Sequence, residues 1–570
     1  MAKVEMKFEN LKDMLDQTEE MYKDRPAFKF KAETPGELEI ITHKEYREQI
    51  KALGTALVDL GLQGERIAVI SENRYEWGLA YFAIATGNGV VVPLDRALPP
   101  NEIESLIERS EVKAIFYSSK YNEAMDEIRE KGLSKVKYFI SMDLTERAGD
   151  VYSQKELLKK GQNLIENGDK RFIDAKIDNE TMGIMLFTSG TTSISKAVML
   201  SHKNIVTNIM DIRASFELNE TDTLLSFLPL HHVFECTAGF LYAISIGASI
   251  VFSKGAKHIA DELKEFQITA MISVPAVFDI MYRKLMKTIE KKGKLETVKK
   301  GIKISEVLPK VKIDIRKKLF SEIHNNLGGK LRFLVAGGAA LDPETEKGFR
   351  DLGFNLLQGY GLTETAPVVA VGLTNCRKLG SIGKKFPSVD VKLFEQDEEG
   401  VGELLVKGPS VMLGYYNNEE ATKSAIDEES WFHTGDLAKI DKDGFIYITG
   451  RKKNVIVLQN GKNIYPEELE ILINKIEGIK ESMIYGMPED GDLTISAKVV
   501  YDKKAMNELY GLETEEKIEE FINEEIKRIN KTMPAYKYIR NVMITEEELI
   551  KTTTLKIKRH EEMKKILNSK

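Results

Sequence analysis

The sequence predicts an α/β fold in three parts: layered α/β units, then antiparallel hairpins, then a small α+β domain. Three observations predict this class. Apolar β-branched runs alternate with amphipathic segments along the first half of the chain, which is typical of largely parallel sheets covered by helices. Short strands with turn signals begin near Val389, and the density of charged residues rises after Arg451.

The first predicted elements are a helix and a series of strands. Residues 45–62 carry apolar side chains at helical spacing. Strands are expected at 66–72, 89–95, 114–119 and 138–143, because each is an apolar run bounded by turn residues. A further buried strand is expected at 182–187, followed by a loop and by a helix that opens near Ser201.

The second half of the chain repeats this alternation and then changes. Strand-like runs read TLLSFLPL, ASIVFSK, AMISVPA and LRFLVAGGAAL, and another buried strand begins at Leu356. The stretches DVKLFEQDEEGVGELLVKG and DKDGFIYITG are typical of antiparallel hairpins, and the helical patterns PEELEILINKI and EEKIEEFINEEIKRINK follow them. We therefore expect one domain at 1–450, a linker near 450–454 and a second domain at 451–570.

Composition excludes several classes of protein. With 42% hydrophobic and 30% charged residues, the 570-residue chain is typical of a globular protein. A net charge of −7 offers no general basic surface for nucleic acid. The run at 289–303 is locally basic; a solvated helix face is the favoured interpretation, and peripheral contact with a membrane surface is the alternative.

Neither a signal peptide nor a transmembrane segment is expected. The N-terminal residues lack the apolar core of a signal peptide. The longest apolar run, AGFLYAISIGASIVF, is shorter than the roughly 20 residues that span a bilayer. Two cysteines, Cys236 and Cys376, support neither a disulfide framework nor a zinc site. We expect a cytoplasmic protein.

The stretch MLFTSGTTSISKAVMLSH, residues 185–202, gathers hydroxyl side chains, a glycine and a lysine between apolar flanks. It is not a P-loop, because that motif would need glycine at Ser195 and a hydroxyl at Ala197. Small residues still let the backbone approach a polyphosphate, hydroxyls donate to its oxygens, and Lys196 supplies positive charge. The alternative is a Ser/Thr-rich turn that forms for backbone reasons.

Two later stretches place polar residues on expected turns. Residues 356–370, LLQGYGLTETAPVVA, carry Tyr360, Thr363 and Glu364, and residues 432–470 carry His433, Asp436, Arg451 and Lys462. With the hydroxyl loop, these motifs and their order resemble the AMP-forming acyl-adenylating superfamily of acyl-CoA synthetases, firefly-type luciferases and peptide-synthetase adenylation domains. The stretches SFLPLHHVFECTAGFL and KTMPAYKYIRNVMITEEELIKTTTLKIKRHEEMKK look closest to bacterial long-chain fatty-acid CoA ligases.

This resemblance implies a fold and a reaction. The N-terminal domain would include a β-barrel-like subdomain and hold the acid and ATP sites, and the C-terminal domain would be mobile. A fatty carboxylate would attack the α-phosphorus of ATP and release diphosphate, and coenzyme A would then displace AMP. The cofactors implied are ATP, Mg²⁺ and coenzyme A. The acid is already ionised at pH 7, so the site must supply cations and preorganised donors rather than a base.

The resemblance also assigns roles to residues. The phosphates of ATP would be held by Lys196 and the hydroxyl loop, Mg²⁺ by Glu364, and the α-phosphate by Thr363. Lys556 would bridge the carboxylate and the α-phosphate, and Asp436 would accept both ribose hydroxyls. The loop residues are Thr188, Ser189, Gly190, Thr191 and Thr192; further nucleotide contacts would come from Gly337, Gly338, Ala339, Gln358, Gly359, Tyr360, Gly361 and Arg451.

Each assignment has an ordinary structural alternative. The stretch AGGAALDP can be a strand end followed by an aspartate that caps a helix, and Asp436 can be a plain turn residue. A lysine such as Lys556 is usually a surface residue. The stretches 233–239 and 274–282 would wall an acyl tunnel, with core packing as the equal alternative.

His231 and His232 form a pair beside an apolar segment. His232 matches the histidine that the family carries near the acid site, so it is a candidate catalytic residue, whereas His231 has no family role. Because the sequence shows no second cluster of ligands, a zinc site is not expected.

For the second half-reaction, the C-terminal domain would rotate about Lys453. It would then present a coenzyme A surface that includes Gly461, Lys462 and Asn463.

The chain departs from the family pattern at Ser193, Ser195 and Ala197, where glycine, proline and glycine are common, and at Leu555, which replaces the glycine before Lys556. The first departures are expected to change the shape of the loop and its affinity for ATP.

Two other functions stay open. The acceptor could be an acyl carrier protein, or the acid could be another carboxylic acid. In a different class, the chain could be a catalytically impaired protein that only binds nucleotide or an acyl group, although the retention of Lys196 and Lys556 argues against this. The partners expected are a fatty acid, ATP and coenzyme A, without nucleic acid, and the chain is expected to be a monomer or a homodimer.

Overall fold

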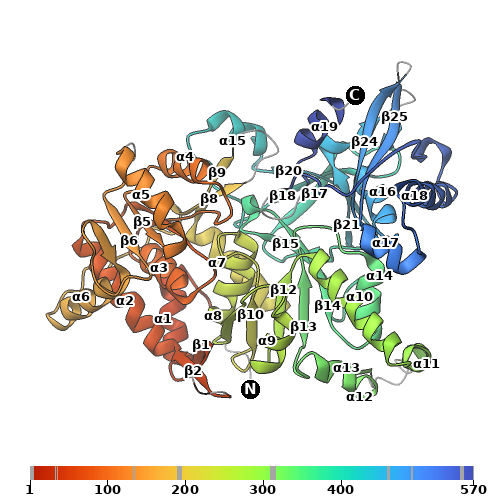
Figure 1. Cartoon of the computed structure of the whole chain (residues 1–570). Helices are drawn as coiled ribbons and strands as arrows, with labels where there is room; N and C mark the ends of the chain where they lie inside the picture. The colour runs from red at the N-terminus through yellow and green to blue at the C-terminus, as the bar shows by residue number, and fades with distance from the viewer. Residues whose placement is uncertain are drawn as a thin grey trace.

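A computed structural model describes residues 6–32, 34, 36–132, 135–188, 195–307, 316–458, 462–489, 492–551 and 557–568. Figure 1 shows two large sheets side by side and the C-terminal region, in blue, at the upper right. Several predicted site residues lie outside the described residues: Ser189, Gly190, Thr191, Thr192, Gly461 and Lys556.

The first large sheet has eight strands in the order β19-β9-β8-β4-β3-β5-β6-β7. The strands from β8 to β7 pair in parallel, as the sequence predicts, whereas β9 and β19 add antiparallel at one edge. The strands are β3 (Arg66–Ile70), β4 (Val90–Pro93), β5 (Ala114–Tyr117), β6 (Tyr138–Ser141), β7 (Val151–Ser153), β8 (Met182–Thr188), β9 (Lys196–Ser201) and β19 (Gly414–Tyr415).

The second large sheet has nine strands in the order β16-β15-β14-β13-β12-β10-β11-β1-β2, and its centre is also parallel. The strands are β1 (Pro26–Lys31), β2 (Leu38–Thr42), β10 (Thr223–Ser226), β11 (Ser249–Phe252), β12 (Ala270–Ser273), β13 (Phe333–Ala336), β14 (Leu356–Gly361), β15 (Val368–Val371) and β16 (Lys384–Lys385).

One layer of helices is shared by the two sheets. Along β3, Ile67 and Val69 face this shared core while Ala68 and Ile70 face the outer helices, as the two-residue period of a strand requires. The shared layer contains α1 (Leu11–Tyr22), α2 (His43–Asp59), α3 (Tyr75–Ala85), α7 (His202–Ser215), the π-helix η2 (Phe234–Leu241) and α8 (Tyr242–Ser245). The helix predicted at 45–62 is α2.

Outer helices cover the remaining faces. The eight-stranded sheet is covered by α4 (Pro100–Ser110) and α5 (Asn122–Lys131), and α6 (Gln154–Glu166) packs on α2. The nine-stranded sheet is covered by α9 (Ile259–Glu265), α10 (Pro275–Lys291), α11 (Leu295–Val307), α13 (Ser321–Asn326) and α14 (Pro343–Asp351), and α12 (Arg316–Leu319) packs against α11 and α13. Helices α11 to α13 lie at the lower right of Figure 1.

The hydroxyl loop joins two strands rather than a strand and a helix. The strand predicted at 182–187 is β8, and the helix predicted to open near Ser201 is α7, which begins at His202. Residues 196–201 form a further strand, β9, in antiparallel register with β8. Ser201 caps α7 by accepting a hydrogen bond from the backbone of Asn204. The Ala-Val-Met-Leu run of β9 is too short for its periodicity to separate strand from helix, so the prediction missed it.

The predicted barrel-like part is an open antiparallel sheet of four strands among the described residues, in the order β17-β18-β20-β21. Its strands are β17 (Asp390–Phe394), β18 (Gly402–Lys407), β20 (Phe432–Ile440) and β21 (Ile446–Arg451). The expected turn positions of His433, Asp436 and Arg451 are wrong, because these residues lie on β20 and β21. The Thr-Gly-Asp sequence suggested a turn, but Gly435, with a φ of 70°, lies within the strand beside an irregular register.

The smaller C-terminal domain has its own apolar cores, which contain only residues from Ile456 onward. A three-stranded sheet packs against its helices. The elements are β22 (Ile456–Val457), β23 (Asn463–Ile464), α16 (Pro466–Ile473), β24 (Ile479–Glu489), β25 (Asp492–Tyr501), α17 (Lys503–Tyr510), α18 (Glu515–Asn530), β26 (Asn541–Thr545) and α19 (Arg559–Asn568).

Within the described parts of the chain, none of the helices has the length and apolar character needed to cross a bilayer.

Candidate active site

Beside the loop of the β8–β9 hairpin, the Lys196 ammonium and the Glu364 carboxylate both contact Tyr415. Thr188 and Lys196 are paired residues at the ends of the two strands. The Lys196 ammonium lies 4.7 Å from the centre of the Tyr415 ring, and the Tyr415 hydroxyl donates to Glu364 Oε1 at 2.9 Å. Burial, then the neighbouring Glu364 carboxylate, raises the pKa of Tyr415, so this phenol stays a hydrogen-bond donor.

Helix α7 fixes the segments that carry these residues. The amide of Asn204 donates to the backbone oxygens of Pro409 and Val411, just before Tyr415. One turn later, the amide of Asn208 exchanges two hydrogen bonds with the backbone of Val368, just after Glu364. Because residues four apart lie on one helix face, a single helix holds both segments in place.

Ser193, Ser195 and Ala197, which depart from the family pattern, lie in or beside this hairpin. Ala197 lies in β9 without a positive φ, so the strand conformation tolerates alanine there. The backbone oxygen of Ser195 accepts a hydrogen bond from Arg109. Ser193 lies outside the described residues.

A second charged group lies on β14, β20 and β21. Asp436 is buried, with Oδ2 accepting from the Tyr360 hydroxyl at 2.6 Å and Oδ1 lying 2.7 Å from Arg451 Nε. Burial, then the Asp436 charge, raises the pKa of Tyr360. The resemblance assigned Tyr360 to the nucleotide contacts and did not indicate its hydrogen bond to Asp436.

The glycines expected around the nucleotide lie at the carboxyl ends of β13 and β14, which are adjacent parallel strands. Gly338 has a φ of 83°, which favours glycine, and a Cβ on Gly337 would come within 2.8 Å of the Phe234 ring, which would have to shift. Gly361 cannot accept a side chain, because a Cβ would lie 2.0 Å from the Pro367 oxygen. Gln358 is buried here, Gly359 is also on β14, and Ala339 is exposed.

The alternative interpretation of AGGAALDP also holds in part. Asp342 caps α14 by accepting from the backbone of Glu344, so the strand end, the glycines and the cap coexist.

The two histidines lie on the loop after β10, and the structure adds a carboxylate that the sequence did not indicate. His231 Nε2 is 3.2 Å from Asp95 Oδ1, and the rings of His231 and His232 are 4.2 Å apart. Asp95 follows β4 in the other large sheet, so only the fold brings the three together. Asp95 is a third possible metal ligand beside the His pair, and its distance from them in the sequence is why the motifs did not indicate it.

The candidate hinge and coenzyme A residues lie between the two domains' cores. Lys453 is exposed in the short helix η5 (Lys452–Asn454), Lys462 is exposed, and Asn463 begins β23. Across the domains, Lys475 on the C-terminal side is 3.0 Å from Glu344, and the Tyr465 hydroxyl donates to Asp397 at 3.0 Å.

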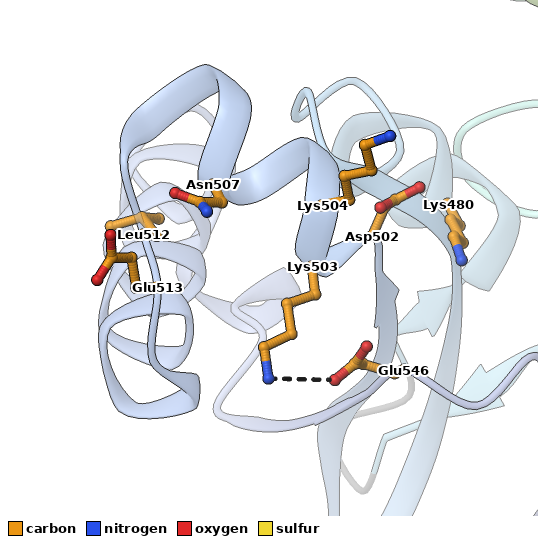
Figure 2. A pocket seen from close by; sticks show the side chains of 8 residues that line it. All are labelled: Lys480, Asp502, Lys503, Lys504, Asn507, Leu512, Glu513 and Glu546. Atoms are coloured by element: carbon orange, nitrogen blue, oxygen red, sulfur yellow. Dashed lines mark ion pairs between the residues drawn. The ribbon is translucent and has the colours of Figure 1, made fainter.

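An open pocket of about 580 Å³ lies elsewhere, in the C-terminal domain. Figure 2 shows that Lys480, Lys503 and Lys504 alternate there with acidic side chains, and that Lys503 pairs with Glu546. None of the predicted site residues that the structure describes lines it, and its mixed charge favours no single ligand.

Comparison with known proteins identifies the class. Residues 15–416 match the family described as AMP-binding enzyme, and residues 453–566 match the C-terminal domain of the same enzymes. The chain therefore belongs to the AMP-binding enzyme family, which confirms the resemblance to the superfamily. The glycines predicted for the nucleotide lie at the carboxyl ends of β13 and β14, which is where open α/β sheets commonly bind ligands.

Individual relatives indicate which members of the family the chain is similar to. A fatty acyl-CoA synthetase B of Dictyostelium discoideum is 30% identical over 480 residues, which are 79% of this chain and 70% of that protein. The long-chain-fatty-acid–CoA ligase FadD15 of Mycobacterium tuberculosis is 30% identical over 497 residues, 82% of this chain and 78% of its own. Among solved structures, the anthranilate CoA ligase AuaEII in complex with anthranoyl-AMP has a TM-score of 0.77 at 19% identity, with 98% and 97% of the two chains covered. ATP-bound MatB of Rhodopseudomonas palustris has a TM-score of 0.75 at 22% identity, with 98% and 99% covered. At these identities the structures show the shared fold.

Proposed function

We propose that the protein is a fatty-acid CoA ligase that forms AMP. A fatty carboxylate oxygen bonds to the α-phosphorus of ATP as diphosphate leaves, and the coenzyme A sulfur then bonds to the acyl carbon as AMP leaves. The observation that carries the proposal is the placement of Lys196 and Glu364 around Tyr415, because an ATP-dependent acid activation needs a cation and a metal-binding carboxylate beside the phosphates. The buried Asp436, held by Tyr360, supports it. The names of the relatives support the fatty acid and coenzyme A.

The described residues fit the roles this reaction requires. Lys196 would offset the charge of the departing diphosphate, and Thr363 would donate to the α-phosphate. Glu364 offers carboxylate oxygens of the kind that Mg²⁺ prefers, and Tyr415 fixes one of them by donation. When bound, Mg²⁺ would neutralise phosphate charge. Asp436 would accept the ribose hydroxyls, with Arg451 and Tyr360 holding its carboxylate in place.

The remaining roles belong to the same proposal. We place the domain boundary at 450–451, supported by the separate apolar cores that begin at Ile456. The C-terminal domain would be mobile about Lys453, bringing Lys556 to the acid in one state and Gly461, Lys462 and Asn463 to coenzyme A in the other. His232 would contact the acid. Two free cysteines fit a reducing cytoplasmic setting, and the enzyme would act as a monomer or a homodimer.

We also propose that helices α10 to α12 form a surface that contacts anionic membranes. Between residues 280 and 330 the sequence holds 15 basic and 5 acidic residues, whereas the whole chain carries a net charge of −7. Eleven of the basic side chains are exposed, and Ile280 and Leu319 are exposed apolar residues beside them. Lysines near an anionic bilayer contribute about 1 kcal/mol each. The exposed basic residues are Arg283, Lys284, Lys287, Lys291, Lys292, Lys294, Lys299, Lys300, Lys303, Lys317 and Lys318.

Diphosphate release tests the ligase proposal. Wild type and Lys556→Ala would be assayed with ATP, Mg²⁺ and a panel of fatty acids, with and without coenzyme A. We expect acid-dependent release in the wild type, its collapse in the variant, and acyl-CoA when coenzyme A is present. Release without acyl-CoA would point to another acceptor, such as an acyl carrier protein. ATP binding without release for any acid would point to a nucleotide-binding protein and would refute the ligase.

A further inference from the structure

The carboxyl ends of the two large sheets bring together three donors, of which only His232 has a role in the proposed reaction. We propose that Asp95, His231 and His232 bind a divalent transition-metal ion such as Zn²⁺, with three protein ligands and one open coordination position. This site does not depend on the proposed function, because its occupancy is measured directly. It also differs from the Mg²⁺ position at Glu364 in its donor chemistry.

The spacing of the donors suits one ion. His231 Nε2 and Asp95 Oδ1 are 3.2 Å apart. In a tetrahedral zinc site, ligand atoms at about 2.0–2.1 Å from the metal lie roughly 3.3 Å from each other. One donor atom from each of the three residues can be chosen so that all lie within 4.8 Å of one another, and this is the one such group of three found among the described residues.

The donor set selects the kind of metal. Two imidazoles and one carboxylate suit zinc, cobalt or nickel, whereas magnesium takes oxygen ligands almost exclusively. Three protein ligands leave a fourth position for water or another small ligand, which is the arrangement of an open rather than a purely structural zinc site.

His231 has a buried ring nitrogen that is available to a metal ion. Its side chain is buried, and its Nε2 atom lacks a hydrogen-bond partner among the described residues, although Asp95 lies within ion-pair distance. An aligned Asp–His hydrogen bond would be the ordinary arrangement at that distance. A nitrogen left unpaired in a buried position is destabilising, and a bound metal would remove that cost.

The two sheets hold the donors in place before any ion arrives. Asn73, which follows β3, donates to the Leu228 backbone oxygen at 2.6 Å and accepts from the Leu230 backbone at 3.1 Å. Strands β3 and β4 are neighbours, so the loop that carries both histidines is fixed to the sheet that carries Asp95. Such preorganisation favours metal binding, because little conformational entropy is lost.

Cobalt binding tests the site in the full-length protein without a histidine tag. Chelator-treated wild type would be titrated with Co²⁺ and followed by visible absorption, with Zn²⁺ titration by calorimetry in parallel. We expect one equivalent per chain and the intense visible bands of four-coordinate cobalt, with Zn²⁺ displacing the cobalt. Asp95→Asn and His231→Gln should each weaken binding at least tenfold.

Matched controls separate this site from surface binding. His258→Gln and His560→Gln remove exposed histidines and should leave the titration unchanged. Circular dichroism and the thermal midpoint without metal show whether each variant is folded. Wild type without stoichiometric cobalt bands, or a folded Asp95→Asn variant that binds with wild-type affinity, would overturn the proposal, and the group would then be an Asp–His ion pair only.

Discussion

Tyr415 contacts both a cation, Lys196, and a carboxylate, Glu364, beside the loop of the β8–β9 hairpin. Its ring faces Lys196 and its hydroxyl donates to Glu364. Tyr415→Phe keeps the ring and removes the donor, so we expect kcat/KM for MgATP to fall about tenfold, the effect of losing about 1.4 kcal/mol from a hydrogen bond to a charged group. Tyr415→Ala should cost several-fold more, because the cation–π contact is also lost. Initial rates of diphosphate release measure both effects.

Tyr416→Phe is the matched control, because its hydroxyl binds Glu111 on the other side of the strand. Its rate should stay within about twofold of wild type, since pairs near the surface contribute little. Equal losses in the Tyr415→Phe and Tyr416→Phe variants would show that strand β19, rather than the Glu364 contact, accounts for the effect.

Glu235 is a buried carboxyl in the π-helix η2, and burial raises its pKa to about 8 from the ordinary 4.5, although hydrogen bonds from Ser226 and the Leu228 backbone lower it in part. The folded protein therefore binds a proton that the unfolded chain releases between about pH 4.5 and 8. The resulting stability is fully present below pH 4.5 and is lost as the pH rises to 8.

The prediction concerns Glu235→Gln, which does not titrate. The thermal midpoint of this variant minus that of wild type should increase as the pH is raised from 5 to 8 and then level off. Differential scanning calorimetry at five or six pH values measures the difference. A difference that is constant with pH would mean that Glu235 is ionised in the folded protein.

Residues from local motifs could be predicted, whereas their partners could not. Lys196, Glu364 and Asp436 were identified because each lies in a short stretch with family-like spacing. Tyr415 and Asp95 lie in stretches with no such pattern, and they reach the site only through strand pairing with β9 and through the neighbourhood of two sheets. A single sequence contains no direct signal for contacts between positions so far apart.

At the scale of elements, α7 is the helix on which the site depends. Asn208 makes two hydrogen bonds with the buried backbone of Val368. Asn208→Ala would leave a buried amide and a buried carbonyl unpaired, so we expect a loss of about 2–3 kcal/mol in the free energy of unfolding. Urea unfolding measures this change.

Lys203→Ala is a control on the same helix, because Lys203 is exposed and forms an ion pair with exposed Glu180. It should change stability by less than about 0.5 kcal/mol. A similar loss in both variants would indicate that α7 contributes through its helical stability rather than through the asparagine contact.

Helix α10 supplies the sharpest test of membrane contact. Lys284, Lys287 and Lys291 are exposed on this helix at spacings of three and four residues. Changing all three to Glu should reduce binding to vesicles of phosphatidylglycerol and phosphatidylcholine by at least 100-fold, since each lysine contributes about 1 kcal/mol. Vesicle sedimentation at low and physiological salt measures the binding.

The control carries the same change of charge elsewhere. Lys423, Lys504 and Lys517 are exposed outside this surface, and their replacement by Glu should alter vesicle binding by no more than a few-fold. If the two triple variants lose binding equally, net charge rather than α10 determines the attraction.

The elements themselves were predicted with uneven success. The parallel strands β3 to β6 were placed correctly, because each is an apolar run with turn residues on both sides. The strands β9 and β20 were missed in full or in part, since one is short and the other contains a Thr-Gly-Asp sequence typical of turns. The open four-stranded sheet differs from the expected barrel because closure depends on pairing between its edge strands, which is a long-range property.

For the whole molecule, the ion pair between Glu344 and Lys475 joins the two domains at 3.0 Å. If the C-terminal domain rotates during the reaction, a covalent link here should support one half-reaction and block the complete cycle. The test uses Glu344→Cys and Lys475→Cys with Cys376→Ser, joined by a bis-maleimide whose linker contains a reducible disulfide. Single-turnover adenylate formation and thioester formation from supplied acyl-adenylate are measured separately.

Reduction of the linker should restore the complete cycle, which distinguishes constraint from damage. Each single-cysteine variant treated with the same reagent serves as the control. A linked enzyme that makes acyl-CoA at the unlinked rate would show that no large rotation is required.

The interleaving of the two large sheets has a consequence for synthesis on the ribosome. Strand β1 must pair with β11, and the paired residues Phe28 and Ile250 are more than 200 positions apart. At roughly 5–20 residues per second, the nascent chain spends about 10–45 s with an apolar edge whose partner has not been made. Strand β9 likewise lacks its pairing partner β19 until more than 200 further residues have been synthesised. The cellular yield of this protein should therefore respond to chaperone supply and to codon choice between these strands, even when the finished enzyme is fully stable.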